Sequence, residues 1–352
     1  MAFFLSNRTS DPDEEECPFL YGSVWHKSYL TDDTRRNLVA LTIITSILVL
    51  PTILLNALVV IAVATRHRLQ TPSNILLASM AGTDLFTGLI VQPIAVAVHL
   101  KRILRDDPFC ILETIYIQLW CASAITSFSH LVLIGIDRFI AVKKPLRYQD
   151  IVTRQRVTIG AILAWAFTFC LIIEELILFA IGSKQQVFFY GEIQGVILSM
   201  IGMFYIVVIV YMYGYIYSES RRQKKRLKNE QLTQEEARKV KKDNKATNTV
   251  TIILGVVLLT YLPSIIWTAV IASSDYMLEP RSMAIVWGWT DTLVILGSLC
   301  NPLIYCWRFK KLRHAFLEML RLREPDNRPP KIEMAVIRRH RPEVPQIGRA
   351  SV

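Results

Sequence analysis

The run 38–64 reads LVALTIITSILVLPTILLNALVVIAVA, carries no charge and lies between Arg35-Arg36 and Arg66. An α-helix needs about 20 consecutive, mostly apolar residues to cross a bilayer, and this run is longer than that. Its internal proline, Pro51, would break a soluble helix but is tolerated among packed membrane helices. The run therefore predicts a helix that spans a membrane.

Six more apolar runs of spanning length follow, at 73–98, 109–142, 157–181, 193–217, 247–274 and 283–307. The chain of 352 residues is 52% hydrophobic and only 20% charged, whereas soluble domains carry about 25% charged residues. Six cysteines, with no Cys/His cluster at metal-ligand spacing, exclude a disulfide scaffold and a zinc module. We expect an all-α membrane protein, a seven-transmembrane helix bundle over residues 37–307.

The basic residues set the orientation of this bundle. Of the 40 Lys and Arg residues, 30 lie in the loops after the first, third and fifth spans and in the C-terminal tail. Because Lys and Arg accumulate on the cytoplasmic side, the tail 1–36 is predicted to be extracellular. The net charge of +11 then needs no nucleic-acid partner, because the basic run 221–226 is typical of a patch beside anionic lipid.

Both tails carry recognisable features. Asn7-Arg8-Thr9 is a glycosylation sequon, which has meaning only on the extracellular side. In 308–320, apolar residues recur at helical spacing between basic ones, which predicts a short amphipathic helix on the inner membrane surface. The remainder, 321–352, is rich in Pro and Arg and is predicted to be a disordered cytoplasmic tail.

Polar residues inside the spans are candidate functional residues, because an ionisable group there is costly unless it is paired or hydrated. Asp84 lies in the middle of the second span, and other mid-membrane positions are also polar: Asn56, Ser127, Ser298 and Asn301. Their oxygens could ligate a small hydrated cation, or they could form an interhelical hydrogen-bond network without an ion. Residue spacing leaves both alternatives open.

Charged residues also gather at the two ends of the bundle. Asp137-Arg138 closes the third span, and Asp243 at the start of the sixth span offers a second acid. An arginine pair that forms and breaks between helices predicts a switch, because buried ion pairs contribute little to stability alone. The extracellular halves of the spans hold a candidate ligand pocket, although interface anchoring is the alternative for Trp287. Its members are Glu113, Trp120, Glu174, Trp287 and Asp291.

Over residues 37–320 the chain resembles the rhodopsin-like (class A) G-protein-coupled receptors. The resemblance rests on one landmark in most spans, in order and at family spacing. These are Asn56 in the first span, Asp84 in the second, Asp137-Arg138 in the third, Pro145-Leu146-Arg147-Tyr148 after it, then Trp165, Tyr213, Pro263 and Asn301-Pro302-Leu303-Ile304-Tyr305.

The resemblance implies a plasma-membrane receptor that binds an extracellular ligand and activates a heterotrimeric G protein. In such receptors the sixth helix moves outward about Pro263, with Pro302 as a second hinge, while Tyr213 and Tyr305 turn inward. It further implies arrestin and a receptor kinase as partners, and a sodium ion at Asp84 with no other cofactor. No nucleophile–base constellation stands out, so we expect no enzymatic activity.

Several positions depart from the family pattern. Tyr261 replaces the usual tryptophan and is counted with the ligand pocket, and Tyr205 replaces the proline of the fifth helix. The amine-binding aspartate of aminergic receptors would fall at Trp120, and the retinal lysine of opsins at Ile295. We therefore expect a peptide, lipid or other non-monoamine ligand. The missing proline and loop cysteine also resemble the melanocortin, cannabinoid and lysophospholipid receptor group.

The family's outer disulfide is altered as well. The expected third-span cysteine falls at Glu113, whereas Cys110 lies one turn earlier, and the second outer loop has no cysteine. Cys17 in the extracellular tail is the remaining cysteine in an oxidising compartment, which predicts a Cys17–Cys110 bridge. Two free thiols are the alternative, because sequence alone does not determine connectivity.

Two other classes of membrane protein compete with a signalling receptor. A transporter would show internal repeats with broken helices at matching positions, and the seven spans show no such repeat. A decoy receptor would bind its ligand without signalling, but the intact Asp137-Arg138 argues against it.

Overall fold

The computed structural model describes residues 31–104, 110–182, 184–229, 258–270, 280–308 and 310–320, together with 252, 255 and 256. All of the secondary-structure elements in this described part are helices, which confirms the all-α class. The long helices are α2 (Asp32–Thr65), α3 (Pro72–Phe86), α4 (Gln92–Leu104), α5 (Cys110–Lys143), α7 (Arg154–Ile181), α8 (Lys184–Asn229) and α10 (Pro280–Arg308). Two shorter ones are α6 (Tyr148–Ile151) and α11 (Lys310–Met319).

Six of the helical stretches in the described part are long and apolar enough to cross a membrane, with α3 and α4 forming one continuous stretch. A shorter apolar helix, Leu258–Val270, lies where the sixth span was predicted. The helices extend beyond their apolar runs because their ends can reach the polar headgroup region. Thus α2 begins at Asp32, where the side chain of Thr31 accepts a hydrogen bond from the backbone nitrogen of Thr34 at 3.4 Å.

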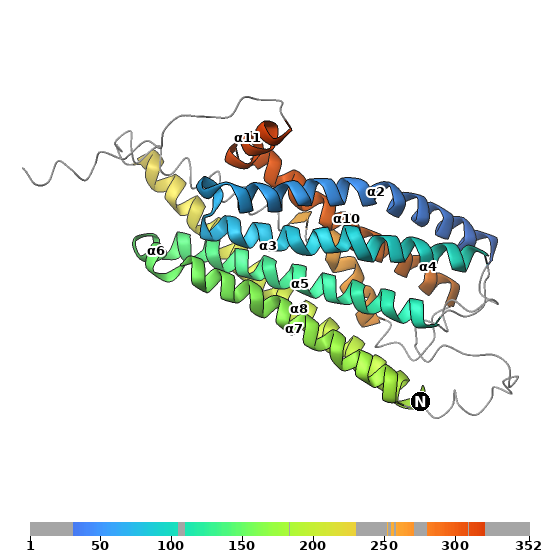
Figure 1. The fold of residues 1–352 in the computed structure, drawn as a ribbon. Coiled ribbons are helices and arrows are strands. Elements are labelled where there is room, and N and C mark those ends of the chain that lie inside the picture. Colours follow the sequence, from blue (N-terminus) through green and yellow to red (C-terminus); the bar gives the residue numbers. More distant parts are fainter. Residues whose placement is uncertain are drawn as a thin grey trace, which may run out of the picture.

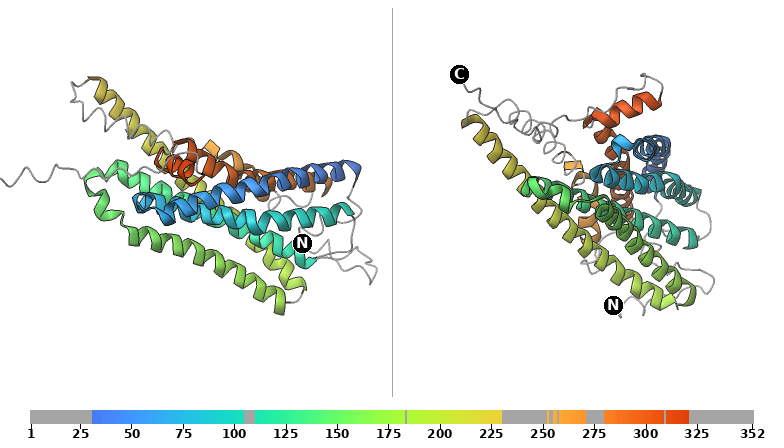
Figure 2. Two further views of the ribbon diagram at one scale, coloured as in Figure 1. Left: turned by 45° about the horizontal axis from the view of Figure 1, so that its top comes forward. Right: turned by 60° about the vertical axis from the view of Figure 1, so that its left-hand side comes forward.

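The helices run lengthwise beside one another, as Figure 1 shows. Helix α2 packs against α3, α4 and α10, while α5 packs against α3, α7 and α8. Helix α11 turns away from α10 and also contacts α2, whereas the end of α8 that is drawn in yellow projects beyond its neighbours (Figure 2). We call the end of the bundle that carries α6 the α6 end, and the opposite end, where α4 finishes at Leu104, the α4 end.

Helix α5 connects to its neighbours through polar side chains as well as apolar ones. The hydroxyl groups of Thr126 and Thr168 lie 2.7 Å apart, which joins α5 to α7. His130 is fully buried, and its Nε2 lies 2.7 Å from the hydroxyl oxygen of Ser79 on α3. Hydrogen bonds of this kind hold membrane helices together, because the lipid supplies no competing polar partner.

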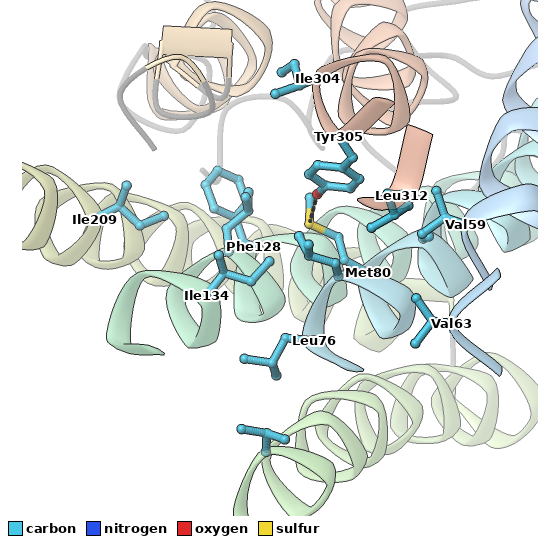
Figure 3. Packing of buried hydrophobic residues seen from close by; sticks show 14 of the residues in the cluster. Val59, Val63, Leu76, Met80, Phe128, Ile134, Ile209, Ile304, Tyr305 and Leu312 are labelled. Atoms are coloured by element: carbon cyan, nitrogen blue, oxygen red, sulfur yellow. Dashed lines mark hydrogen bonds between the residues drawn. The ribbon is translucent and has the colours of Figure 1, made fainter. Parts of the chain in front are cut away.

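The apolar side chains divide between a packed interior and an outer surface. Figure 3 shows part of the interior, where Val59, Leu76, Met80 and Phe128 come from three helices and belong to the same cluster as Tyr305. Many large apolar side chains on α7 and α8 point outward instead, including Ile162 at 60% exposure. An outer apolar surface of this extent is what a helix bundle presents to lipid.

Candidate functional site

Arg138 is held near the end of α5 by two polar groups, one of which is bound in turn by a tyrosine. Its Nε donates a hydrogen bond to Oδ2 of Asp137 at 2.8 Å, and a terminal nitrogen donates to the hydroxyl of Ser73. Tyr148 donates its hydroxyl proton to the other carboxylate oxygen of Asp137 at 2.6 Å. We call Ser73, Asp137, Arg138 and Tyr148 the arginine clamp. The Asp137 side chain is 2% exposed, so its charge depends on these partners.

Tyr148 lies outside the spans, on α6, and its phenol is half-buried. Burial raises the pKa of Tyr148, and the hydrogen bond to Asp137 raises it further. The hydroxyl group therefore keeps its proton at neutral pH and remains a donor to Asp137.

The clamp contains two residues that the sequence did not single out as polar partners. Tyr148 was noticed only as part of a loop landmark, and Ser73, directly after the Pro72 that starts α3, carried no chemical signal. Asp243, which was predicted as a second acid for Arg138, lies outside the described residues.

Tyr213 and Tyr305 lie in the interior between this clamp and the middle of the bundle. The Tyr305 side chain is fully buried, and its hydroxyl donates to the sulfur of Met80 at 3.2 Å (Figure 3). Tyr213 is 4% exposed and packs in the same apolar cluster. Tyr213 lies on α8 and Tyr305 on α10, so a shift of either helix changes the surroundings of its tyrosine.

Asp84 lies at the centre of the bundle and is fully buried. Asn301 on α10 donates its side-chain amide to Oδ2 of Asp84 at 2.9 Å. The amide of Asn56 donates to the backbone carbonyl of Ser298 at 3.1 Å, which joins α2 to α10. These contacts bring together the polar positions of three spans, and Ser127 on α5 lies buried among the same helices.

This central network is short of hydrogen bonds. Among the described residues, Oδ1 of Asp84, Oγ of Ser127 and Oδ1 of Asn56 are buried and have no partner. Buried oxygens without partners are rare in native proteins and indicate water or an ion. Hard cations take oxygen ligands, so the residues present fit a small cation that Asp84 would neutralise. The described part holds no group of three His, Cys, Asp or Glu suited to a transition metal.

A cavity opens toward the α4 end between α5, α8, the helix Leu258–Val270 and α10. Its empty volume, counted together with the open solvent at its mouth, is about 820 Å³. Most of its wall is aromatic or aliphatic. Four predicted pocket residues line it: Trp120, Tyr261, Trp287 and Asp291.

Two other predicted pocket residues do not line this cavity. Glu113 forms an ion pair with Arg102, whose Nε lies 2.9 Å from the Glu113 carboxylate, and both side chains are almost fully buried. Glu174 is exposed on α7. The sequence missed the partner of Glu113 because Arg102 was placed beyond the second span, whereas α4 continues to Leu104 and buries it.

The cysteines add no described disulfide to this site. Cys121, Cys170, Cys300 and Cys306 form no disulfide. Cys17 and Asn7 lie outside the described residues, and so does the side chain of Cys110, although α5 begins at this residue. The Cys17–Cys110 bridge and the glycosylation of Asn7 therefore stay predictions.

Comparison with known proteins gives a consistent set of relatives. The family model described as 7 transmembrane receptor (rhodopsin family) matches residues 55–305. Trace amine-associated receptor 2 of Homo sapiens is 30% identical over 76% of this chain and 78% of its own length. Trace amine-associated receptor 4 of Mus musculus is 29% identical over 72% and 77%. The 5-hydroxytryptamine receptor 1D of Homo sapiens is 28% identical over 52% and 50%.

Proposed function

Because the chain belongs to the rhodopsin family of seven-transmembrane receptors, we propose that it binds an extracellular ligand in the cavity and activates a heterotrimeric G protein at the α6 end. The family consists of receptors rather than enzymes, and its members are multi-pass membrane proteins with a seven-helix bundle. The ligand class and the coupling to a G protein are the steps that this proposal adds.

The arginine clamp is the observation that carries the proposal. Arg138 is neutralised by Asp137, and the two residues are tied to α3 and α6 through Ser73 and Tyr148. The cavity lies toward the other end of the bundle, and α5 is common to both regions. A ligand that binds the open form more tightly shifts the population toward that form, in which the helix 258–270 swings about Pro263 and Arg138 is released.

The proposal places the N-terminus outside and the α6 end in the cytoplasm of a cell with this receptor in its plasma membrane. The support is the accumulation of Lys and Arg in the loops and tail at that end. Helix α11, with Leu312 and Phe316 buried against the bundle, would lie along the inner membrane surface. Arrestin and a receptor kinase are further proposed partners, through the resemblance alone.

A sodium ion is proposed for the central network. Asp84 would supply the negative charge, and Ser127, Ser298, Asn301 and Asn56 the neighbouring oxygens. The support is the set of buried oxygens without partners described above. When bound, such an ion would offset the cost of a buried carboxylate and tie α3, α5 and α10 together.

The names of the relatives and the local sequence point in different directions on the ligand. Two relatives are named for trace amines and one for 5-hydroxytryptamine, whereas Trp120 stands where aminergic receptors carry their amine-binding aspartate. The resemblance to melanocortin, cannabinoid and lysophospholipid receptors stays a prediction, because the relatives reported above are receptors with other names. The ligand class therefore depends on the side chains that line the cavity.

The proposal is tested in cells that express the full chain with a panel of G-protein subunits and a ligand library, read by G-protein dissociation. We expect Arg138→Ala to abolish ligand-stimulated dissociation at unchanged surface expression, because its guanidinium is the group released toward the G protein. Arg36→Ala is the matched control, since Arg36 is an exposed arginine on the other side of the membrane in this orientation. Full signalling by Arg138→Ala contradicts the switch, and ligand binding without dissociation of any G protein favours a decoy receptor.

A further inference from the structure

Among the described residues that line the cavity there is one carboxylate, in a wall that is mostly aromatic and aliphatic. Asp291 on α10 lines it together with six aromatic side chains: Tyr116, Trp120, Phe128, Tyr205, Tyr261 and Trp287. The Tyr116 hydroxyl and the Trp287 indole lie within hydrogen-bonding reach of the Asp291 carboxylate. An ionisable residue in a membrane helix faces a functional cavity far more often than it serves packing.

Among the described residues, Asp291 forms no ion pair of its own. Arg102 is the nearest cation that acts on Asp291, but its guanidinium is already paired with Glu113 at 2.9 Å. When Asp291 is ionised and His99 is neutral, Arg102, Glu113 and Asp291 together carry one surplus negative charge. A buried surplus charge costs several kcal/mol in an apolar environment, and a ligand cation would offset that cost.

Two buried polar atoms of the cavity residues have no partner in the described part of the chain. They are Oδ1 of Asp291, an acceptor, and Nε1 of Trp120, a donor. The terminal torsion of an aspartate is broad and nearly two-fold, so either carboxylate oxygen can turn toward a ligand. The cavity therefore offers one negative acceptor on α10 and one neutral donor on α5.

We propose that Asp291 is the cation-binding residue of this cavity, and that the ligand is an organic amine in its protonated form. The ammonium group lies against Asp291 and the faces of the neighbouring aromatic rings, which attract cations through their quadrupoles. An acceptor atom elsewhere on the ligand receives the Trp120 indole proton. This inference deepens the proposed function and rests on the cavity being the ligand site.

The position of the carboxylate accounts for the conflict over the ligand. A tryptophan at position 120 removes an acid from α5, and Asp291 supplies one from α10 in the same cavity. The amine then binds with its charged end toward α10, so its aromatic portion extends toward α5 and α8. Ligand preference should differ from that of a receptor whose acid lies on α5.

The test is thermal unfolding of the purified full chain in lipid nanodiscs, which requires no G protein. Tryptamine and phenethylamine are each compared with their neutral alcohols, tryptophol and phenethyl alcohol. We expect the amines to raise the unfolding temperature and the alcohols to leave it unchanged. Asp291→Asn should weaken amine binding about 30-fold or more, as loss of one partner of a buried charge pair does. Asp291→Glu should retain amine binding, and Glu174→Gln, which changes an exposed carboxylate, should match the unmodified chain.

Each outcome bears on the inference. If neither amine stabilises the chain, if the alcohols act equally, or if Asp291→Asn binds amines as well as the unmodified chain does, the inference is overturned. The comparison of amine with alcohol in the unmodified chain decides the matter even if Asp291→Asn fails to fold. Amine binding without G-protein dissociation supports the inference and contradicts the proposed coupling. Signalling driven only by a neutral ligand supports the proposed coupling and contradicts the inference about Asp291.

Discussion

At the scale of single residues, the buried carboxylates of Asp137 and Asp84 differ in how many of their oxygens have hydrogen-bond partners. The Asp137 carboxylate accepts from Tyr148 at 2.6 Å and from Arg138 at 2.8 Å, so all its charge is used inside the clamp. The central Asp84 instead keeps one oxygen without a partner. A carboxylate whose oxygens all have hydrogen-bond partners stabilises one conformation, whereas a carboxylate oxygen without a partner is available to a ligand.

Tyr148→Phe tests the clamp by removing a single hydroxyl group. It removes one hydrogen bond to a charged acceptor, worth about 1.5 kcal/mol, which corresponds to a roughly tenfold rise in the active fraction without ligand. We expect higher ligand-free G-protein dissociation at matched expression. Tyr211→Phe is the control, because Tyr211 is 67% exposed on α8. Equal ligand-free activity in the two variants would remove Tyr148 from the clamp.

The pH dependence of this contact follows from the direction of the pKa shift. Because the pKa of Tyr148 is raised in the folded chain, the donated proton stabilises the clamp below the ordinary tyrosine pKa of about 10. That contribution is lost only as pH rises through the higher folded value. The difference between Tyr148→Phe and the unmodified chain should therefore be constant from about pH 6 to 9.

At the scale of elements, the second span is interrupted by a π-helical turn, Thr87–Val91, between α3 and α4. The backbone N–H of Gln92 donates to the carbonyl of Thr87, and the next residue, Pro93, has no N–H to continue the regular pattern. The turn brings Gly88 against α2. A Cβ there would lie 3.0 Å from a side-chain carbon of Ile53 and 3.3 Å from its backbone nitrogen.

Gly88→Ala should destabilise the bundle, because the added methyl group meets backbone as well as side chain. Overpacking of this kind costs about 1–3 kcal/mol. Gly82→Ala on α3 is the matched control, since a Cβ at Gly82 meets nothing within 4 Å and alanine favours a helix. We expect a lower unfolding temperature in nanodiscs for Gly88→Ala and an equal or higher one for Gly82→Ala. A stable Gly88→Ala would show that α2 and the turn separate easily.

At the scale of the whole molecule, two helices, α5 and α10, connect the cavity, the central network and the regions beyond it. Helix α10 carries Asp291 in the cavity, Asn301 in the central network and Tyr305 in the interior beyond it. Helix α5 carries Trp120, Ser127 and Arg138 in the same order. A shift of α5 therefore changes the cavity, the central network and the clamp together, and a shift of α10 changes the cavity and the central network, which is the physical basis for coupling between them.

Sodium should lower the affinity for an activating ligand if the ion favours the closed form. By linkage, the ligand then lowers the affinity for sodium by the same factor, typically about 5- to 150-fold. Asp84→Asn should make ligand binding insensitive to sodium, because the amide keeps the shape of the side chain and removes its charge. Radioligand binding in sodium and in potassium buffers measures the effect.

Asp150→Asn is the control for this experiment, because Asp150 is exposed on α6 and lies away from the central network. It should keep the full sodium effect. Sodium sensitivity that persists in Asp84→Asn would place the ion elsewhere or reduce it to a general salt effect.

Local properties of the sequence determined the class of fold. Uncharged runs such as 38–64 must lie in lipid, and a lone Asp84 inside such a run must be paired or hydrated, whatever surrounds it. The same reasoning predicted that Asn301 and Asp84 would belong to one polar network, and that Trp120, Tyr261, Trp287 and Asp291 would belong to one pocket.

Only the tertiary structure decided which of these polar groups meet. The helix rotations place Arg102 against Glu113 and bring Ser73 to Arg138. Among the described residues they leave Oδ1 of Asp291 without a hydrogen-bond partner. The π-helical turn before Pro93 changes the direction of every side chain that follows it in α4. Such pairings depend on the rotation and register of whole helices, which the packing of the bundle sets and no local pattern of residues encodes.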